Sequence, residues 1–185
     1  MQLVLASRSP RRRELLSLLT EDFICCPSGS EEVIDPALSP DELVQALARQ
    51  KAAAVLPQYP DSLILGCDTI VVDPDGIICG IPADRDAAVQ MLRRLSGRTH
   101  RVLTGVCLLT GERELIYSEE TLVTFYPLTD REIEAYLDTG EYRDKAGGYG
   151  IQGKGGVLVK RIEGSYHNVV GLPIGSLHRA IQEFC

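Results

Sequence analysis

Short apolar runs alternate along the chain with stretches whose apolar residues recur every three or four positions. The first pattern is typical of buried strands, and the second is typical of amphipathic helices. Strands are predicted at residues 2–6, 22–26, 63–65, 70–72, 77–79, 100–109, 114–126 and 157–162. Helices are predicted at residues 10–19, 40–55, 84–95, 129–137 and 173–184. Strands that alternate with helices favour a mixed α/β fold.

Two long strands are predicted next to each other within residues 100–126. They predict a mixed sheet that continues into two lobes, flanked by helices, with a central cleft between the lobes. No internal repeat, low-complexity tract or interdomain linker interrupts the chain. Residues 1–185 are therefore interpreted as one two-lobed domain.

Composition narrows the class of protein. Apolar residues make up 44% of the chain and the mean hydropathy is zero, which supports a full core and argues against disorder. No apolar run approaches the roughly 20 residues that span a bilayer. The amino terminus places arginines after its short apolar run, the reverse of a secretory signal. We therefore expect a cytoplasmic protein with no membrane partner.

Charge and cysteine content exclude further classes. The chain has 26 acidic and 19 basic residues, a net charge of −7 and a pI near 5.0. An acidic surface repels nucleic-acid backbones, so we expect no nucleic-acid partner, and any phosphate site must be a local basic pocket. The six cysteines lack the spacing of a zinc site, and we expect reduced thiols.

A basic segment at residues 7–14 is the first candidate for chemistry. Three consecutive arginines, 11–13, fall in the first turn of the predicted helix that Ser9 and Pro10 begin. Cations are unfavourable there because the helix dipole already places positive charge at its amino end. A bound anion such as a triphosphate would compensate. The alternative is a solvated basic turn neutralised by Glu14 and other acids.

Asp68 is the second candidate, because it follows the apolar run of residues 63–65. We place it at the end of a strand, where a carboxylate could hold Mg²⁺ or orient a water molecule. The alternative is a turn aspartate that binds local backbone amides. Glu32 in a loop and Lys51 in a helix are weaker candidates, since surface positions would explain both.

A glycine-rich loop at residues 144–156 is the third candidate. It fits GxGxxG, but it does not open a helix after a clear strand, so a dinucleotide fold is not supported. It also fits GxxxxGK, yet Gly155 stands where a P-loop needs Ser or Thr. Gln152 remains, an amide able to read the edge of a base through its donor and its acceptor. The alternative is a flexible surface loop.

Several segments together resemble the Maf family of nucleoside triphosphate pyrophosphatases. They are LASRSPRRRELL, LARQKA, LILGCDTIVV, HRVLTGV, DKAGGYGIQGKGG and NVVGLP, in order from residue 3 to about residue 174. The resemblance implies a two-lobed α/β fold of the Maf/Ham1 kind and a homodimer. It also implies hydrolysis between the α and β phosphates, with a divalent cation, Mg²⁺ or Mn²⁺, as cofactor.

The resemblance also implies roles for individual residues. Asp68 would accept the proton of the attacking water, and Asp68 and Glu32 would hold the metal. Substrate specificity would depend on Arg11, Thr69 and Gln152. The phosphates would contact Ser7, Arg12 and Lys51. The YGIQG sequence is similar to the branch that acts on dTTP and UTP, and clearing modified pyrimidine nucleotides is the expected role.

One departure from the family leaves a second hypothesis open. Ile81 stands where the family usually has a lysine that would neutralise phosphate charge. Loss of such a charge-assisted contact typically costs about 1.5–3 kcal/mol. The alternative function is therefore a catalytically weak, nucleotide-binding regulator of cell division and septum formation. A kinase-like P-loop protein is a third hypothesis, which Gly155 argues against.

Overall fold

The computed structural model of the chain describes residues 1–29 and 32–184 and contains one mixed sheet, which confirms the predicted α/β class. Its strand order is β2-β1-β3-β5-β6-β7, and β4 pairs with β3. The strands are β1 (Leu3–Leu5), β2 (Phe23–Cys25), β3 (Leu63–Val72), β4 (Ile78–Cys79), β5 (Thr99–Leu109), β6 (Glu114–Phe125) and β7 (Val159–Glu163). The α-helices are α1 (Pro10–Ser17), α2 (Pro40–Val55), α3 (Arg85–Leu95), α4 (Asp130–Leu137), α5 (Tyr166–Val170) and α6 (Ile174–Phe184).

The chain divides into two compact units. The first unit comprises residues 1–69, 104–119 and 171–185, and the second comprises residues 70–103 and 120–170. Three of the four divisions fall within β3, β5 and β6, so each of these strands contributes to both units, and the fourth follows α5. None of the helices in the described ranges is long and apolar enough to cross a membrane.

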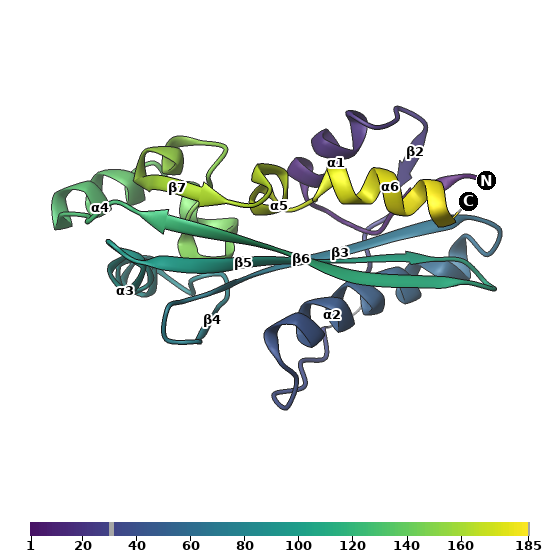
Figure 1. Cartoon of the computed structure of the whole chain (residues 1–185), viewed down its shortest axis with the longest axis horizontal. Coiled ribbons are helices and arrows are strands. Elements are labelled where there is room, and N and C mark those ends of the chain that lie inside the picture. The colour runs from purple at the N-terminus through teal and green to yellow at the C-terminus, as the bar shows by residue number, and fades with distance from the viewer. Residues whose placement is uncertain (30–31, 185) are drawn as a thin grey trace. The chain divides into compact units, whose positions relative to one another are not determined.

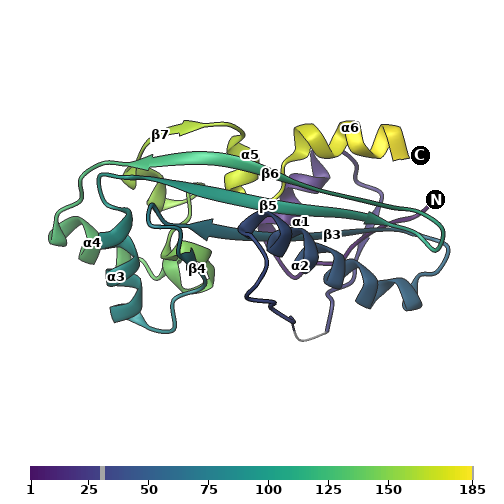
Figure 2. The ribbon, with the colours of Figure 1, turned by 60° about the horizontal axis from the view of Figure 1, so that its bottom comes forward.

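In the first unit, helices lie on both faces of the sheet. The parallel strands β1, β2 and β3 pair in the register Leu3 with Phe23 and Leu3 with Leu63. Helix α2 lies on one face of this part of the sheet, and α1 and α6 lie on the other (Figures 1 and 2). Ser39 and Glu42 form a capping box that begins α2, and the apolar residues that follow at helical spacing are buried.

In the second unit, two amphipathic helices and the glycine-rich loop complete the core. Asp84 caps α3, which packs against α4, and a capping box begins α4. The turn at residues 73–76 leads into β4, as predicted, with Asp73 Oδ1 accepting from the backbone amides of Asp75 and Ile77. Strand β7 pairs antiparallel with β6.

The structure corrects several predicted boundaries. The strands predicted at residues 63–65 and 70–72 are one continuous strand, β3, which continues beside β5 after its pairing with β1 has ended at Leu65. Strand β7 begins at Val159 rather than at residue 157, because a 3₁₀ turn occupies Lys154–Leu158. Helix α1 ends at Ser17, before residue 19, and the short helix α5 is not foreseen by the pattern.

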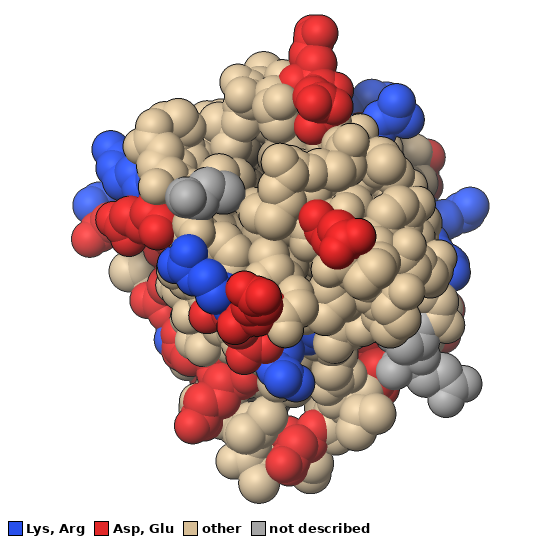
Figure 3. Space-filling model, turned by 90° about the vertical axis from the view of Figure 1, so that its right-hand side faces the viewer, with Lys and Arg blue, Asp and Glu red and all other residues tan. Residues whose placement is uncertain are grey.

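On the face seen in Figure 3, acidic and basic side chains are interspersed among uncharged residues instead of gathering by sign. The five cysteines within the described ranges are free. The loop predicted at residues 27–39 lacks regular structure over its described part, and residues 30 and 31 lie outside the described residues.

Candidate functional site

The basic segment forms the start of α1, as predicted. Ser9 is the N-cap, and its hydroxyl accepts from the backbone amide of Arg12 at 3.4 Å. The hydroxyl of Ser7 accepts from the Ser9 amide at 3.1 Å. The first turn of α1 holds no acidic residue. Three arginines therefore crowd a helix end that favours anions.

Arg12 is held by three oxygen atoms. Its Nε donates to the Gly171 carbonyl at 2.9 Å, its Nη2 to Thr69 Oγ1 at 3.0 Å, and its Nη1 to Ser7 Oγ at 3.4 Å. These acceptors are uncharged, so they orient the guanidinium without cancelling its charge. Thr69 also shares a 2.9 Å hydrogen bond with Thr104. The structure thus brings together three residues predicted for the substrate: Ser7, Arg12 and Thr69.

A second cluster in the same unit centres on Lys51. Its Nζ hydrogen-bonds to Asp68 Oδ1 and lies 2.9 Å from Glu32 Oε1. The side chain of Lys51 is only 15% exposed, which contradicts a solvated surface role for it. The side chains of Asp68 and Glu32 are 13% and 45% exposed. These three predicted residues therefore converge, although 36 positions separate Glu32 from Asp68.

Two glycines place Lys51 beside Asp68. A Cβ at Gly66 would lie 2.1 Å from the Ala48 carbonyl oxygen, and one at Gly105 would lie 2.2 Å from the Val44 carbonyl oxygen. Only glycine permits α2 to approach β3 and β5 so closely. Lys51 follows Ala48 by three residues and so shares its helix face. The packing of α2 therefore carries Lys51 onto the sheet.

The structure corrects the position predicted for Asp68. It lies in the interior of β3 and not at a strand end. Successive side chains of a strand leave opposite faces, so Asp68 shares the α2 face with Gly66, and Thr69 faces α1. The pairing of β1 with β3 ends at Leu65, one residue before Gly66. Within the described chain, both clusters therefore flank the stretch of β3 that begins where β1 stops.

Two further predicted residues are Arg11 and Gln152. Arg11 is half-buried on the first turn of α1. Gln152 is exposed and belongs to the second unit, as does Ile81, which is 61% exposed. The glycine-rich loop around Gln152 is tied down: the Gly150 amide donates to Tyr136 Oη at 3.1 Å, and the Lys154 amide donates to the Glu141 carboxylate at 2.8 Å. These bonds argue against an unattached surface loop.

Sequence reasoning missed Thr104 and Gly171. Both lie in segments that carried the resemblance, HRVLTGV and NVVGLP, but neither residue type announces a site. Gly171 has a φ of +125°, a backbone conformation that favours glycine, and it offers its carbonyl to Arg12. Thr104 is fully buried. Their roles become visible only through the partners that folding provides.

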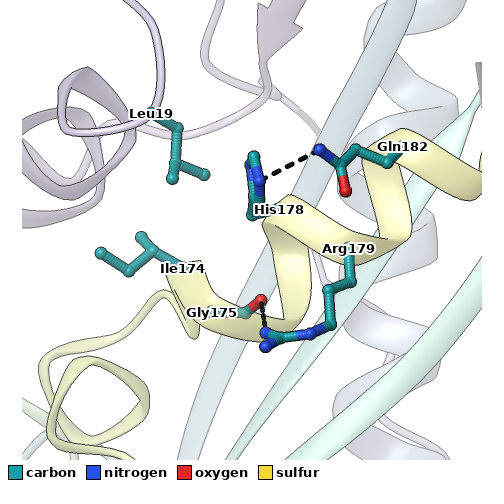
Figure 4. Close-up of a pocket in the computed structure, with 6 residues that line it drawn as sticks. All are labelled: Leu19, Ile174, Gly175, His178, Arg179 and Gln182. Carbon is teal, nitrogen blue, oxygen red and sulfur yellow. Dashed lines mark hydrogen bonds between the residues drawn. The ribbon is translucent and has the colours of Figure 1, made fainter.

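An open hollow in the first unit lies elsewhere. It has a volume of about 510 Å³ and is lined by Leu19, which follows α1, and by residues of α6. Figure 4 shows His178 pointing toward Gln182 and Arg179 bonded to the Gly175 carbonyl. None of the residues predicted for the substrate lines this hollow. We therefore assign the site to the two clusters at β3.

Comparison with known proteins identifies the family. Residues 2–184 match the family described as Maf-like protein. The chain belongs to the Maf family. Two curated members are a dTTP/UTP pyrophosphatase of Bacillus velezensis, 50% identical over 99% of this chain and 96% of its own, and one of Halalkalibacterium halodurans, 53% identical over 97% and 94%.

A solved structure supports the fold of this Maf protein. The Ham1 protein of Staphylococcus aureus superimposes over the whole of both chains with a TM-score of 0.58 and 10% sequence identity. At that identity the likeness concerns the fold alone. It confirms the predicted Ham1-like architecture.

Proposed function

We propose that this protein is a nucleoside triphosphate pyrophosphatase that hydrolyses dTTP and UTP to the monophosphate and pyrophosphate. Its near-full-length identity of about one half to dTTP/UTP pyrophosphatases carries the proposal. The two clusters at β3 supply the chemistry that this reaction needs. One holds a carboxylate that can accept a proton, and the other holds an oriented cation for phosphate.

Asp68 is the proposed proton acceptor. A water molecule attacks the α phosphorus, its proton passes to the Asp68 carboxylate, and the bond from the α phosphorus to the bridging oxygen breaks. Pyrophosphate leaves with that oxygen. Lys51, which contacts Asp68, holds the carboxylate in place, and the fork of Arg12 offers a fixed positive charge to the phosphates.

A divalent cation is proposed at the carboxylate pair. Among the described residues, no group of three or more His, Cys, Asp or Glu side chains is placed to hold a metal. Mg²⁺ is nevertheless often bound through one or two carboxylates together with substrate phosphates and waters. Asp68 and Glu32 both contact the Lys51 ammonium, so their carboxylates lie close together, a pair of oxygen donors that fits such an ion. When bound, it would neutralise phosphate charge.

Base selection is proposed to involve Arg11, Thr69 and Gln152. The hydroxyl of Thr69 is engaged by Arg12 and Thr104, which supports a role for Thr69 in setting the direction of Arg12. Gln152 is exposed, and its amide would supply both a donor and an acceptor to a pyrimidine edge.

Product analysis tests the proposal. Pure protein is incubated with Mg²⁺ or Mn²⁺ and each common triphosphate, beside Asp68→Asn and the control Asp61→Asn, which changes an exposed aspartate of the same unit. We expect dTMP or UMP with pyrophosphate from dTTP and UTP, lost in Asp68→Asn and retained in the control. Orthophosphate with a nucleoside diphosphate would contradict the proposed bond cleavage.

The exposed Ile81 favours a second candidate, a catalytically weak nucleotide-binding regulator of septum formation. Its signature would be calorimetric binding of dTTP without product from any nucleotide. In that case Ile81→Lys should produce measurable turnover with the same base preference. Robust turnover by the unmodified protein would instead make Ile81 a tolerated difference.

We further propose that the protein acts as a homodimer in the cytoplasm and clears modified pyrimidine nucleotides. Family membership supports these points. Sedimentation equilibrium tests the oligomeric state. Turnover of 5-substituted pyrimidine triphosphates against dTTP tests the range of substrates, and rejection of all of them would contradict the clearing role.

A further inference from the structure

A buried histidine and a buried tyrosine form a pair in the second unit. His100, on β5, is 1% exposed, and its Nε2 lies 2.8 Å from Tyr149 Oη. Tyr149 is 5% exposed. The ring of Phe125 meets both edge-on, with centroid distances of 5.0 Å to His100 and 4.7 Å to Tyr149. This hydrogen bond therefore lies inside an aromatic core, away from solvent.

Both members of the pair are neutral at ordinary pH. Burial lowers the pKa of His100 to about 4 and raises the pKa of Tyr149 well above its usual value. His100 Nδ1 has no hydrogen-bond partner among the described residues, so Tyr149 is the polar contact that the structure gives this ring. Removing either partner leaves a buried polar group unsatisfied, at a typical cost of about 1–3 kcal/mol.

Tyr149 belongs to the glycine-rich loop, residues 144–156. The next residue, Gly150, donates its amide to Tyr136 Oη, and four residues further on Lys154 donates its amide to Glu141. The backbone of residues 149–154 is thus fixed at both ends. Gln152 lies between these anchors and is exposed.

The loop has little freedom to adjust. A Cβ at Gly150 would lie 2.4 Å from Lys145 Cε, and one at Gly155 would lie 2.6 Å from the Gly150 carbonyl oxygen. A shift of Tyr149 would therefore pass to its neighbours along the backbone. Recognition of a base edge depends on hydrogen-bond geometry, so a displacement of the loop would weaken the binding of the base.

We propose that His100 is a positioning residue for substrate specificity: by holding the Tyr149 hydroxyl, it fixes the backbone that presents Gln152 to the base. The proposal rests on the role given to Gln152 in the proposed function. His100 itself is buried and touches no reacting atom. It acts through Tyr149, which precedes Gln152 by three positions in the same loop.

The experiment compares variants of the whole chain with the protein of unchanged sequence. Tyr149→Phe removes the hydroxyl and keeps the ring, and His100→Gln keeps a polar side chain near that hydroxyl. Gln152→Ala removes the proposed base contact. Thr121→Val is the control, because it removes a fully buried hydroxyl of the same unit that bonds to Ser165 and Asn168 and not to the loop. The readouts are KM and kcat for dTTP and ATP, calorimetric Kd for dTTP, and Tm.

Loss of one neutral hydrogen bond between Gln152 and the base corresponds to a change of about three- to tenfold in affinity for the nucleotide. We expect Tyr149→Phe to raise KM and Kd for dTTP by about that factor, to leave kcat within about twofold, and to reduce the preference for dTTP over ATP by a similar factor. His100→Gln should have a smaller effect. Adding it to Tyr149→Phe should change KM little further, because both remove the same contact. Thr121→Val should lower Tm and leave KM unchanged.

Two results would overturn the inference. If Tyr149→Phe lowers Tm as Thr121→Val does but leaves KM, Kd and base preference unchanged, His100 is structural only. If effects on KM are fully additive in the double variant, the two residues do not act together. Failure of the underlying function has a different signature: Gln152→Ala would then leave dTTP affinity and preference unchanged.

Discussion

At the scale of single residues, the chemistry of Arg12 depends on its acceptors. Three neutral oxygens fix the direction of the guanidinium and leave its charge for a ligand. An ion pair with a carboxylate in the same place would have neutralised that charge within the protein. The fork geometry also explains why arginine stands there, because a lysine ammonium has no planar array of donors.

Arg12→Lys tests this assignment. The ammonium keeps the charge but loses the two parallel bonds to Gly171 and Thr69, so we expect kcat/KM for dTTP to fall at least about tenfold. Steady-state kinetics with dTTP measure the loss. Arg113→Lys is a matched control, because Arg113 also donates to a backbone carbonyl, that of Phe184, and belongs to neither cluster. Equal losses in the two variants would argue against a phosphate role for Arg12.

Protonation of His100 should make stability depend on pH. The ring has an ordinary pKa of 6.5 when the chain is unfolded and about 4 when it is folded. Between these values the unfolded chain binds the extra proton, so the free energy of unfolding falls as pH is lowered from about 6.5 to about 4. The contribution amounts to about 3 kcal/mol over that range. Urea unfolding against pH measures it, and His100→Gln should remove this part of the slope.

Residue types alone could identify some of these groups. Three arginines at a helix start and an aspartate after an apolar run conflict with local expectation, and such conflicts are typical of functional sites. Thr104 and Gly171 carry no such conflict. Their partners are 35 and 159 positions away, so the contacts that define their roles exist only after folding.

At the scale of elements, the contact of α2 with the sheet brings Lys51 of the second cluster beside Asp68. Gly66 and Gly105 lie directly under the backbone of α2. Pro40 and the apolar spacing that follows it predict α2 with its observed bounds, because both signals act locally. The sequence predicts two strands in place of β3, because the apolar runs of residues 63–65 and 70–72 are interrupted and Asp68 is a common turn residue. Pairing with neighbouring strands overrides that preference, and sequence spacing does not reveal it.

Gly66→Ala should disturb this contact. The added Cβ would meet the Ala48 carbonyl at 2.1 Å, so α2 must shift. Overpacking of this kind typically costs about 1–3 kcal/mol, and the shift would also move Lys51 away from Asp68. We expect a lower free energy of unfolding and reduced turnover.

Gly111→Ala is the control for that variant. Its Cβ would meet only the Pro60 carbonyl oxygen, at 3.8 Å. Urea unfolding and kcat are measured for both variants. A Gly66→Ala protein as stable and as active as the control would contradict the close packing of α2.

At the scale of the whole molecule, the charge distribution matches a small anionic ligand. The chain carries a net charge of −7, yet its basic residues include the cluster at the start of α1. The alternation of elements was enough to predict one mixed sheet. The two long strands of residues 100–126 were also enough to predict two lobes. The boundaries of the two units could not be placed, because those after residues 69, 103 and 119 fall inside strands that have no break in pattern.

The net charge predicts discrimination between small and large polyanions. A triphosphate reaches one helix start, whereas a duplex presents a long row of phosphates to an acidic surface. We expect a 20-base-pair DNA not to displace dTTP at 0.15 M salt. Competition calorimetry measures this, and displacement at micromolar DNA would contradict the expectation.

The position of Asp68 and Thr69 as neighbours in the interior of β3 has a consequence for how the gene can vary. Their side chains leave opposite faces, one toward Lys51 and the other toward Arg12. Deleting or inserting a single codon earlier in β3 would exchange the faces and turn the carboxylate toward α1 and the hydroxyl toward α2. Changes of length should therefore accumulate in connections such as the one after β2, and the spacing within β3 should stay constant.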